Sequence, residues 1–65
     1  MNITLNGQPK EISTANVQDL VAELQLDNIA LVAEHNGVIL RKEEWTKIPL
    51  QENDQLELIK FCGGG

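Results

Sequence analysis

The sequence has few of the residues on which several common kinds of protein site depend. It contains one cysteine and one histidine, so it can form neither an intramolecular disulfide nor a zinc site built from cysteine and histidine ligands. Five residues are basic against ten acidic ones, and aromatic residues make up only 3% of the chain. A nucleic-acid-binding protein needs basic side chains for phosphates and aromatic surfaces for bases, so the composition argues against this class.

Long apolar runs are also missing. No segment approaches the roughly 20 apolar residues that cross a membrane. Residues Met1–Thr4 show no charged segment leading into an apolar run, so we expect no signal peptide. A free thiol without an export signal fits the reducing cytoplasm. The net charge of −5 favours a protein partner with a basic surface.

The length of 65 residues allows a single domain with a thin core. A hydrophobic content of 42% is enough to build that core. A pocket for a small-molecule substrate occupies roughly 300–1,000 Å³, which so short a chain cannot easily enclose. The length therefore favours a carrier or a binding module over an enzyme.

Short-range patterns predict several strands and a helix. The dipeptides Asn6-Gly7 and Asn36-Gly37 are typical of tight turns between antiparallel strands, because both residue types tolerate positive φ. Pro9 cannot donate a ladder hydrogen bond, so its strand should lie at a sheet edge. A helix is expected after Asn16, a favourable N-cap, from the apolar stripe Val17, Leu20, Val21 and Leu24. The expected strands are residues 2–5, 8–12, 29–34, 38–40 and 55–61.

This order of elements predicts an α+β domain, in which a mixed four- to five-stranded sheet packs on one main helix. The first and last strands can pair in parallel at the centre, because the intervening helix leaves room for a crossover. In a chain of 65 residues this is the β-grasp, or ubiquitin-like, arrangement. We assign the domain to residues 1–61 and expect residues 62–65 to form a flexible C-terminal tail.

The C-terminal tail carries three consecutive glycines, Gly63, Gly64 and Gly65. Glycine adds nothing to packing, and without a Cβ Gly63 and Gly64 could thread a channel too narrow for other residues. Fully extended, residues 61–65 would reach about 17 Å from the domain. We therefore predict that the carboxylate of Gly65, delivered to the active site of another protein, is the working group of the chain.

Four segments resemble the ThiS family, the sulfur carriers of bacterial thiamine thiazole synthesis. They are residues 3–7, 17–21, 32–39 and 54–59, and the glycines follow them. The resemblance covers the whole chain, although Cys62 stands where the family commonly has a small apolar residue.

The resemblance implies a chemistry centred on Gly65. A ThiF-like adenylating enzyme would use ATP to activate the Gly65 carboxylate, and sulfur from a donor such as a cysteine desulfurase would replace the adenylate. The resulting thiocarboxylate would donate its sulfur to a ThiG-like thiazole synthase, with the tether holding it beside the acceptor. Nucleotide and metal would belong to the adenylating partner, so we expect this chain to bind no cofactor and no metal and not to be an enzyme.

A docking patch is predicted next to the tail. If Leu56 and Leu58 face the helix, strand alternation places Ile59 and Phe61 on the opposite face of the sheet. An exposed apolar pair beside the tail would bind a partner. Burial of Phe61 at a curled sheet edge is the alternative.

Three other side chains are expected to have no part in the chemistry. Cys62 is interpreted as an incidental thiol, because nothing near it in the sequence except Lys60 would lower its pKa. His35 is interpreted as a solvated turn residue, and Trp45 as a cap over the core.

Several functions remain open on the sequence alone. A carrier for another sulfur pathway, such as the small subunit of molybdopterin synthase, would share the fold and the tail chemistry. A protein modifier would form an isopeptide bond through Gly65 after the same adenylation. A plain interaction module would not use the glycines, which could also be a frayed end.

Overall fold

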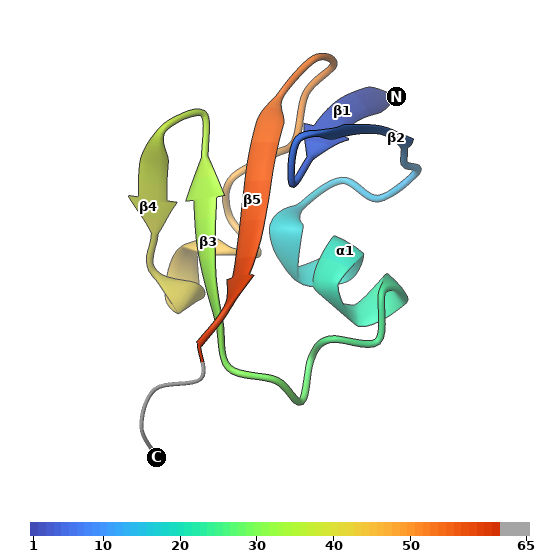
Figure 1. The fold of residues 1–65 in the computed structure, drawn as a ribbon. Coiled ribbons are helices and arrows are strands. Elements are labelled where there is room, and N and C mark those ends of the chain that lie inside the picture. Colours follow the sequence, from blue (N-terminus) through green and yellow to red (C-terminus); the bar gives the residue numbers. More distant parts are fainter. Residues whose placement is uncertain (62–65) are drawn as a thin grey trace.

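The computed structural model describes residues 1–61, in which one α-helix packs against one face of a five-stranded sheet (Figure 1). The elements are β1 (Asn2–Leu5), β2 (Gln8–Glu11), α1 (Val17–Glu23), β3 (Leu31–His35), β4 (Val38–Leu40), the 3₁₀ helix η1 (Lys42–Glu44) and β5 (Gln55–Lys60). The strands lie in the spatial order β2-β1-β5-β3-β4. β5 pairs in parallel with β1 and antiparallel with β3, which confirms the predicted β-grasp arrangement.

Both hairpins turn at the predicted asparagine–glycine pairs. Asn6 and Asn36 each have a φ of 50°, and Gly7 and Gly37 have φ values of 79° and 86°. Two successive residues with positive φ match the right-handed twist of the flanking strands. Pro9 lies in β2, at one edge of the sheet, as its missing amide proton requires.

The side chains of the two turn asparagines also bind the central strand β5. The Leu58 amide donates to Asn6 Oδ1 and the Gln55 amide donates to Asn36 Oδ1, each at 2.8 Å. These bonds continue the backbone ladders past the points where β1 and β3 end. β5 is therefore held on both sides by turns as well as by strands.

Helix α1 begins at the predicted N-cap. The Asp19 amide donates to Asn16 Oδ1 at 2.8 Å, which satisfies one of the free amides of the first turn. The helix ends at Glu23, and Gln25 two residues later has a φ of 60°, a conformation that stops the helix. The side chains that α1 buries are Val17, Leu20 and Val21, with Leu24 partly buried beside them.

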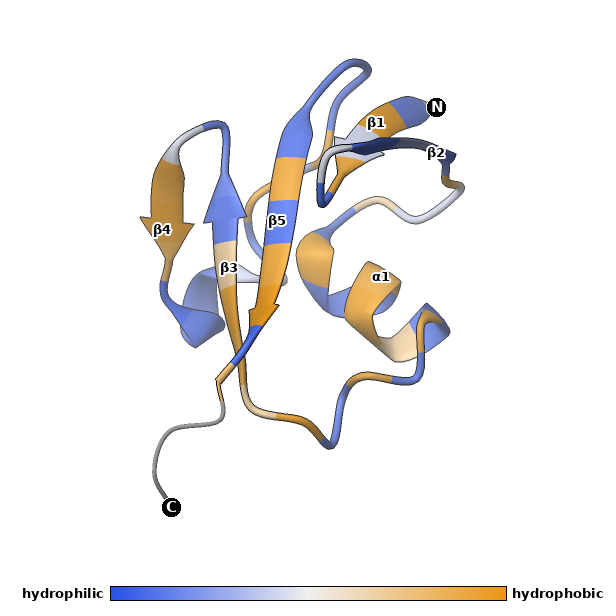
Figure 2. Cartoon of the chain, in the orientation of Figure 1, coloured by the Kyte–Doolittle hydropathy of each residue, from blue (hydrophilic) through white to orange (hydrophobic). Residues whose placement is uncertain are grey.

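The core lies between α1 and the inner face of the sheet. Leu56 and Leu58 of β5 are almost completely buried, as predicted from their alternation. Trp45, which follows η1, is only 4% exposed and covers the core as expected. The other buried apolar residues are Ile3, Ile12, Ala33, Leu40 and Leu50. The hydropathy colouring shows this apolar content on α1 and the facing strands (Figure 2).

The third strand starts later than the sequence predicts. β3 begins at Leu31, whereas Ile29 and Ala30 are exposed and belong to the loop after α1. The Ile29 amide donates to the Leu26 carbonyl at 3.0 Å, so this turn holds Ile29 outside the sheet. The α-helix within residues 1–61 is not long and apolar enough to span a membrane.

Candidate functional site

The face of the sheet opposite α1 carries both predicted docking residues. Ile59 is 51% exposed and Phe61 is 62% exposed, while Leu56 and Leu58 between α1 and the sheet are buried. The predicted alternation along β5 is therefore confirmed, and burial of Phe61 at a curled edge is not observed. The binding role of Ile59 and Phe61 stays a prediction.

Strand register adds two apolar residues that the sequence analysis did not include. Val32 of β3 lies directly opposite Ile59, and Ile39 of β4 lies opposite Glu34 of β3. Residues directly opposite one another share a face of the sheet. Ile39 is 65% exposed, and we call Val32, Ile39, Ile59 and Phe61 the outer apolar patch. The strand β4 and the C-terminal half of β5 stand out as apolar in Figure 2.

Two carboxylates lie within this surface. Glu34 and Glu57 are directly opposite one another in the β3–β5 pair, on the same face as the outer apolar patch. Neither has an ion-pair partner among residues 1–61. Like charges directly opposite in a sheet are destabilising. The pair therefore lowers the stability of the free domain, and a basic partner would relieve the repulsion.

Phe61, the residue just before the C-terminal tail, is hydrogen-bonded to the loop before β3. The Phe61 amide donates to the Ala30 carbonyl at 2.9 Å, which extends the β3–β5 ladder by one bond beyond β5. The predicted site residues Gly63, Gly64 and Gly65, and the thiol of Cys62, lie outside the described residues. The structure thus places Ile59 and Phe61, two residues of the outer apolar patch, on the segment that leads to the glycines.

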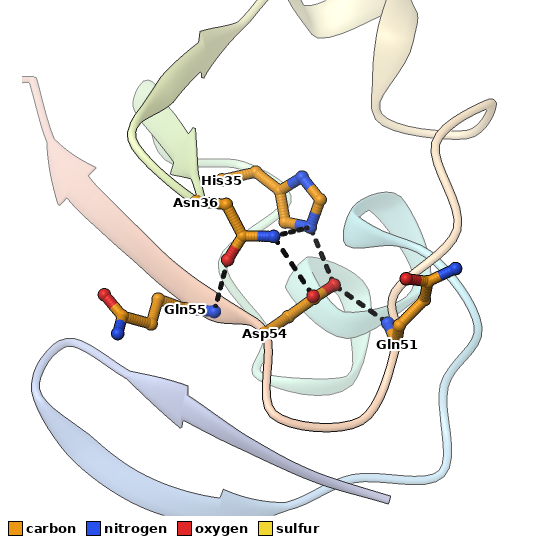
Figure 3. A network of polar contacts seen from close by, with 5 residues as sticks. All are labelled: His35, Asn36, Gln51, Asp54 and Gln55. Atoms are coloured by element: carbon orange, nitrogen blue, oxygen red, sulfur yellow. Dashed lines mark hydrogen bonds and ion pairs between the residues drawn. The ribbon is translucent and has the colours of Figure 1, made fainter.

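His35 is not the solvated turn residue that the sequence suggested. Its side chain is only 15% exposed, and its Nε2 lies 2.7 Å from Oδ2 of Asp54 (Figure 3). Asp54 is also buried, and it accepts hydrogen bonds from Asn36 Nδ2 at 3.1 Å and from the Gln51 amide at 2.8 Å. The interpretation was wrong because His35 and Asp54 are 19 positions apart and meet only when β3 pairs with β5.

This polar network lowers the pKa of Asp54. Burial alone would raise the pKa of the carboxyl, but the hydrogen bonds from His35, Asn36 and Gln51 outweigh it and hold the pKa below its ordinary value. The network lies at the start of β5, whereas the tail leaves from its end (Figure 1). Its role is therefore to fix the turn before β5 rather than to act at the tail.

Residues 1–61 contain neither a pocket nor a group of three potential metal-ligating side chains. Their most distinctive surface is an exposed apolar and acidic sheet face on the strand that precedes a glycine-rich end. This sheet face and the strand topology together define a small β-grasp protein of the ubiquitin-like class. Residues 3–65 match the model of the ThiS family, and the chain belongs to this family.

Known relatives cover the chain over its full length. It is 38% identical to the sulfur carrier protein ThiS of Bacillus subtilis, over 97% of this chain and 98% of that protein. The crystal structure of the thiamine biosynthesis protein ThiS from Geobacter metallireducens superimposes with a TM-score of 0.84, at 32% identity, and the match covers the whole of both chains.

A third relative is much longer than this chain. The thiazole synthase of Paramagnetospirillum magneticum is 30% identical to this chain over the whole of it, but the match covers only 20% of that synthase. The segment that this chain matches is therefore about one fifth of a protein named thiazole synthase.

Proposed function

We propose that this protein is a sulfur carrier in the synthesis of the thiazole of thiamine, with the Gly65 carboxylate as the site of sulfur loading. The observation that carries the proposal is the whole-length membership of the ThiS family in a chain that ends in Gly63, Gly64 and Gly65. The likeness to a curated sulfur carrier distinguishes it from a plain interaction module.

The proposed chemistry first activates the Gly65 carboxyl group and then replaces one of its oxygen atoms by sulfur. A carboxylate is a poor electrophile, because its charge repels nucleophiles and its oxygen is a poor leaving group. A Gly65 oxygen attacks the α-phosphorus of ATP on a ThiF-like enzyme and pyrophosphate leaves, so that the carboxylate becomes a mixed anhydride. The terminal sulfur of a persulfide on a donor such as a cysteine desulfurase then attacks the Gly65 carbonyl carbon, and AMP leaves. A thiol cleaves the resulting acyl disulfide, which releases the thiocarboxylate and leaves the thiol sulfur in a disulfide. ATP and any metal bind to the partner enzyme and not to this chain.

The outer apolar patch is the proposed docking surface for these enzymes. Ile59 and Phe61 are exposed on the strand that leads to the tail, and aromatic and apolar anchors contribute most of the binding energy of such interfaces. Glu34 and Glu57 beside them, with the net charge of −5, favour partners with basic side chains around an apolar centre. Docking of the sheet outside the enzyme would leave the glycines to enter its active site.

A ThiG-like thiazole synthase is the proposed sulfur acceptor. The support is the Paramagnetospirillum protein, in which the ThiS-like segment and a thiazole synthase share one chain. Two domains in one polypeptide meet at a high effective concentration, as a carrier and its acceptor require. In the protein described here, the outer apolar patch would provide the corresponding encounter with the synthase.

Deletion of Gly64 and Gly65 tests the proposal. Because glycine contributes little to packing, we expect the shortened chain to keep the thermal midpoint of the full chain in calorimetry. It should support no thiazole formation in a reaction reconstituted with the adenylating enzyme, the sulfur donor and thiazole synthase. Retained thiazole formation would contradict the carrier function, and a large loss of thermal stability would contradict the view that the tail packs against nothing.

A further inference from the structure

The C-terminal half of β5 has one free edge. Backbone groups of a strand point alternately to its two sides. The Thr4 amide donates to the Asp54 carbonyl and the Asn6 amide to the Leu56 carbonyl, each at 2.9 Å, so these even-numbered positions of the last strand face β1. The Phe61 amide donates to Ala30, so the odd-numbered positions face β3. Lys60 therefore directs its amide and its carbonyl towards the β1 side.

β1 does not extend far enough to pair with these groups. Its ladder with β5 consists of Thr4 opposite Gln55 and Leu5 opposite Leu56, and the chain then turns away at Asn6. The Asn6 side chain accepts from the Leu58 amide, which ends the pairing. Within residues 1–61, no hydrogen bond reaches the Leu58 carbonyl or either backbone group of Lys60.

The two outer edges of the sheet differ from this inner one. β2 contains Pro9, which has no amide proton to offer. β4 has only three residues, and the next amide, that of Arg41, already donates to Glu44 Oε1 at 2.7 Å. On the free edge of β5 the Asn6 side chain occupies the Leu58 amide, but no proline and no side chain among residues 1–61 blocks the backbone groups of Lys60. This edge lies on the strand that leads to the tail.

We propose that this free edge, formed by Leu58 and Lys60, pairs with an extended segment of the adenylating enzyme that receives the tail. The inference rests on the proposed function. Backbone pairing along a strand gives affinity without requiring a particular side chain. Lys60 precedes Gly65 by five positions, or at most about 17 Å of extended chain. A segment paired with Lys60 would therefore align the tail with the active site that it enters.

The charge of the chain favours an enzyme over a second copy as the occupant of this edge. Two copies would each carry a net charge of −5 and would repel one another. An enzyme that binds the acidic face of β3 and β5 through basic side chains meets no such repulsion. Pairing at the free edge would place the enzyme on both the face and the edge of the same strand.

Amide hydrogen exchange of the unmodified chain tests the pairing directly. The probe is the ThiF-type adenylating enzyme of the same organism, added without ATP at saturating concentration. The Lys60 amide should exchange fast in the free chain and at least tenfold more slowly in the complex. The Glu11 amide serves as the control: the Ile12 amide bonds to Met1, so that of Glu11 points out of the sheet at the opposite edge. It should exchange at the same rate in both states.

Proline substitutions provide a second test of the pairing. Lys60→Pro removes only an outward amide and leaves Ile59 in the extended conformation that precedes proline, so the fold should persist. It should raise the KM for adenylation roughly three- to tenfold over that of Lys60→Ala, as expected for one backbone hydrogen bond. Glu11→Pro makes the matched change at the opposite edge and should leave KM unchanged.

The outcomes separate this inference from the proposed function. If the enzyme adenylates the wild type but neither protects the Lys60 amide nor distinguishes Lys60→Pro from Lys60→Ala, the pairing is refuted and the carrier function stands. If the wild type is not adenylated at Gly65, the proposed function fails and the pairing fails with it. Should Lys60→Pro not fold, the exchange of the wild-type Lys60 amide alone decides.

Discussion

At the scale of single residues, Asp54 joins two parts of the chain that are separate in sequence, the β3–β4 hairpin and the turn before β5. Its carboxylate accepts hydrogen bonds from His35 at the end of β3, from Asn36 in the next turn and from the Gln51 amide (Figure 3). Few polar groups of this domain are as deeply buried. His35, whose side chain is largely buried, would lose this acceptor without it, and a shielded donor without an acceptor is costly.

Replacement of this carboxylate should destabilise the domain markedly. We expect Asp54→Ala to lower the free energy of unfolding by about 2–3 kcal/mol, as for the loss of hydrogen bonds to a charged group. Urea denaturation followed by circular dichroism measures the change. Glu52→Ala is a nearby control that removes a single exposed bond, to the Asn2 amide, and should cost much less. Equal effects of the two substitutions would contradict the assigned role of Asp54.

The same carboxylate should make stability depend on pH. Its folded-state pKa is lowered, so its contribution is fully present above the unfolded pKa of about 3.9 and is lost as pH falls through the folded value. The wild type should therefore lose stability below about pH 4 more steeply than Asp54→Asn, which cannot titrate at this position. Urea midpoints measured between neutral and strongly acidic pH test this, and parallel curves for the two proteins would refute it.

Leu56 in β5 and Phe61, one residue beyond β5, should respond differently to truncation. Leu56 is fully buried, so Leu56→Ala should cost about 2–5 kcal/mol of stability. Phe61 is 62% exposed, so Phe61→Ala should change stability little and weaken binding to the adenylating enzyme instead. Calorimetry of the free domain and titration with the enzyme measure the two effects. A stability loss for Phe61→Ala as large as that for Leu56→Ala would place Phe61 in the core.

At this scale the sequence predicts whether a side chain is buried or exposed only where this follows from the alternation of residues along one element. The exposure of Ile59 and the burial of Leu58 follow from alternation along one strand. The contact of His35 with Asp54 and that of Val32 with Ile59 depend on the pairing of β3 with β5, which no local pattern contains. Asn36 illustrates both cases, since its turn was predicted and its side-chain bonds were not.

At the scale of elements, the residues that begin and end each segment are more informative than its interior. Asn16 correctly marked the start of α1, and the two asparagine–glycine pairs marked the hairpins. The predicted start of β3 is wrong, because a turn holds Ile29 in the loop and Ala30 contributes only one carbonyl to the ladder ahead of the strand. An apolar run alone does not show where strand pairing begins.

The cap of α1 supports a prediction of its own. Asn16→Ala leaves the Asp19 amide without its acceptor and should lower the free energy of unfolding by about 0.5–2 kcal/mol. Asn16→Asp is the matched variant and should retain most of the stability, because aspartate is an equally good cap. Thermal unfolding of the two variants provides the comparison. If both lose the same stability, the cap is not the source of the effect.

At the scale of the whole molecule, the topology was predictable because few arrangements suit so short a chain. The first and last strands had to pair across one helix, and β1 and β5 do so. The same topology sets the geometry of the proposed function. The central strand has its buried side chains under α1, Ile59 in the outer apolar patch, and its last residue close in sequence to the tail.

In this arrangement the residues that stabilise the fold differ from those that are proposed to bind partners and to carry the chemistry. The network of Asp54 and the core under α1 hold the start of β5, whereas Ile59, Lys60 and Phe61, the proposed partner contacts on this segment, lie towards its other end. Substitutions in the outer apolar patch should therefore affect partners more than folding. The proposed reaction itself depends on a main-chain carboxylate that no side-chain pattern would reveal.

The central claim is that Gly65 carries sulfur, and the intact mass of the chain tests it most directly. The protein is incubated with ATP, a sulfur donor and its adenylating enzyme, and tandem fragmentation then locates any change of mass. Fragmentation is required because oxidation of Met1 or Cys62 adds nearly the same mass as the exchange of one oxygen for sulfur. We predict this exchange at Gly65. An unchanged Gly65 in the presence of a demonstrably active enzyme would contradict the claim, as would an isopeptide bond to another protein in place of the thiocarboxylate.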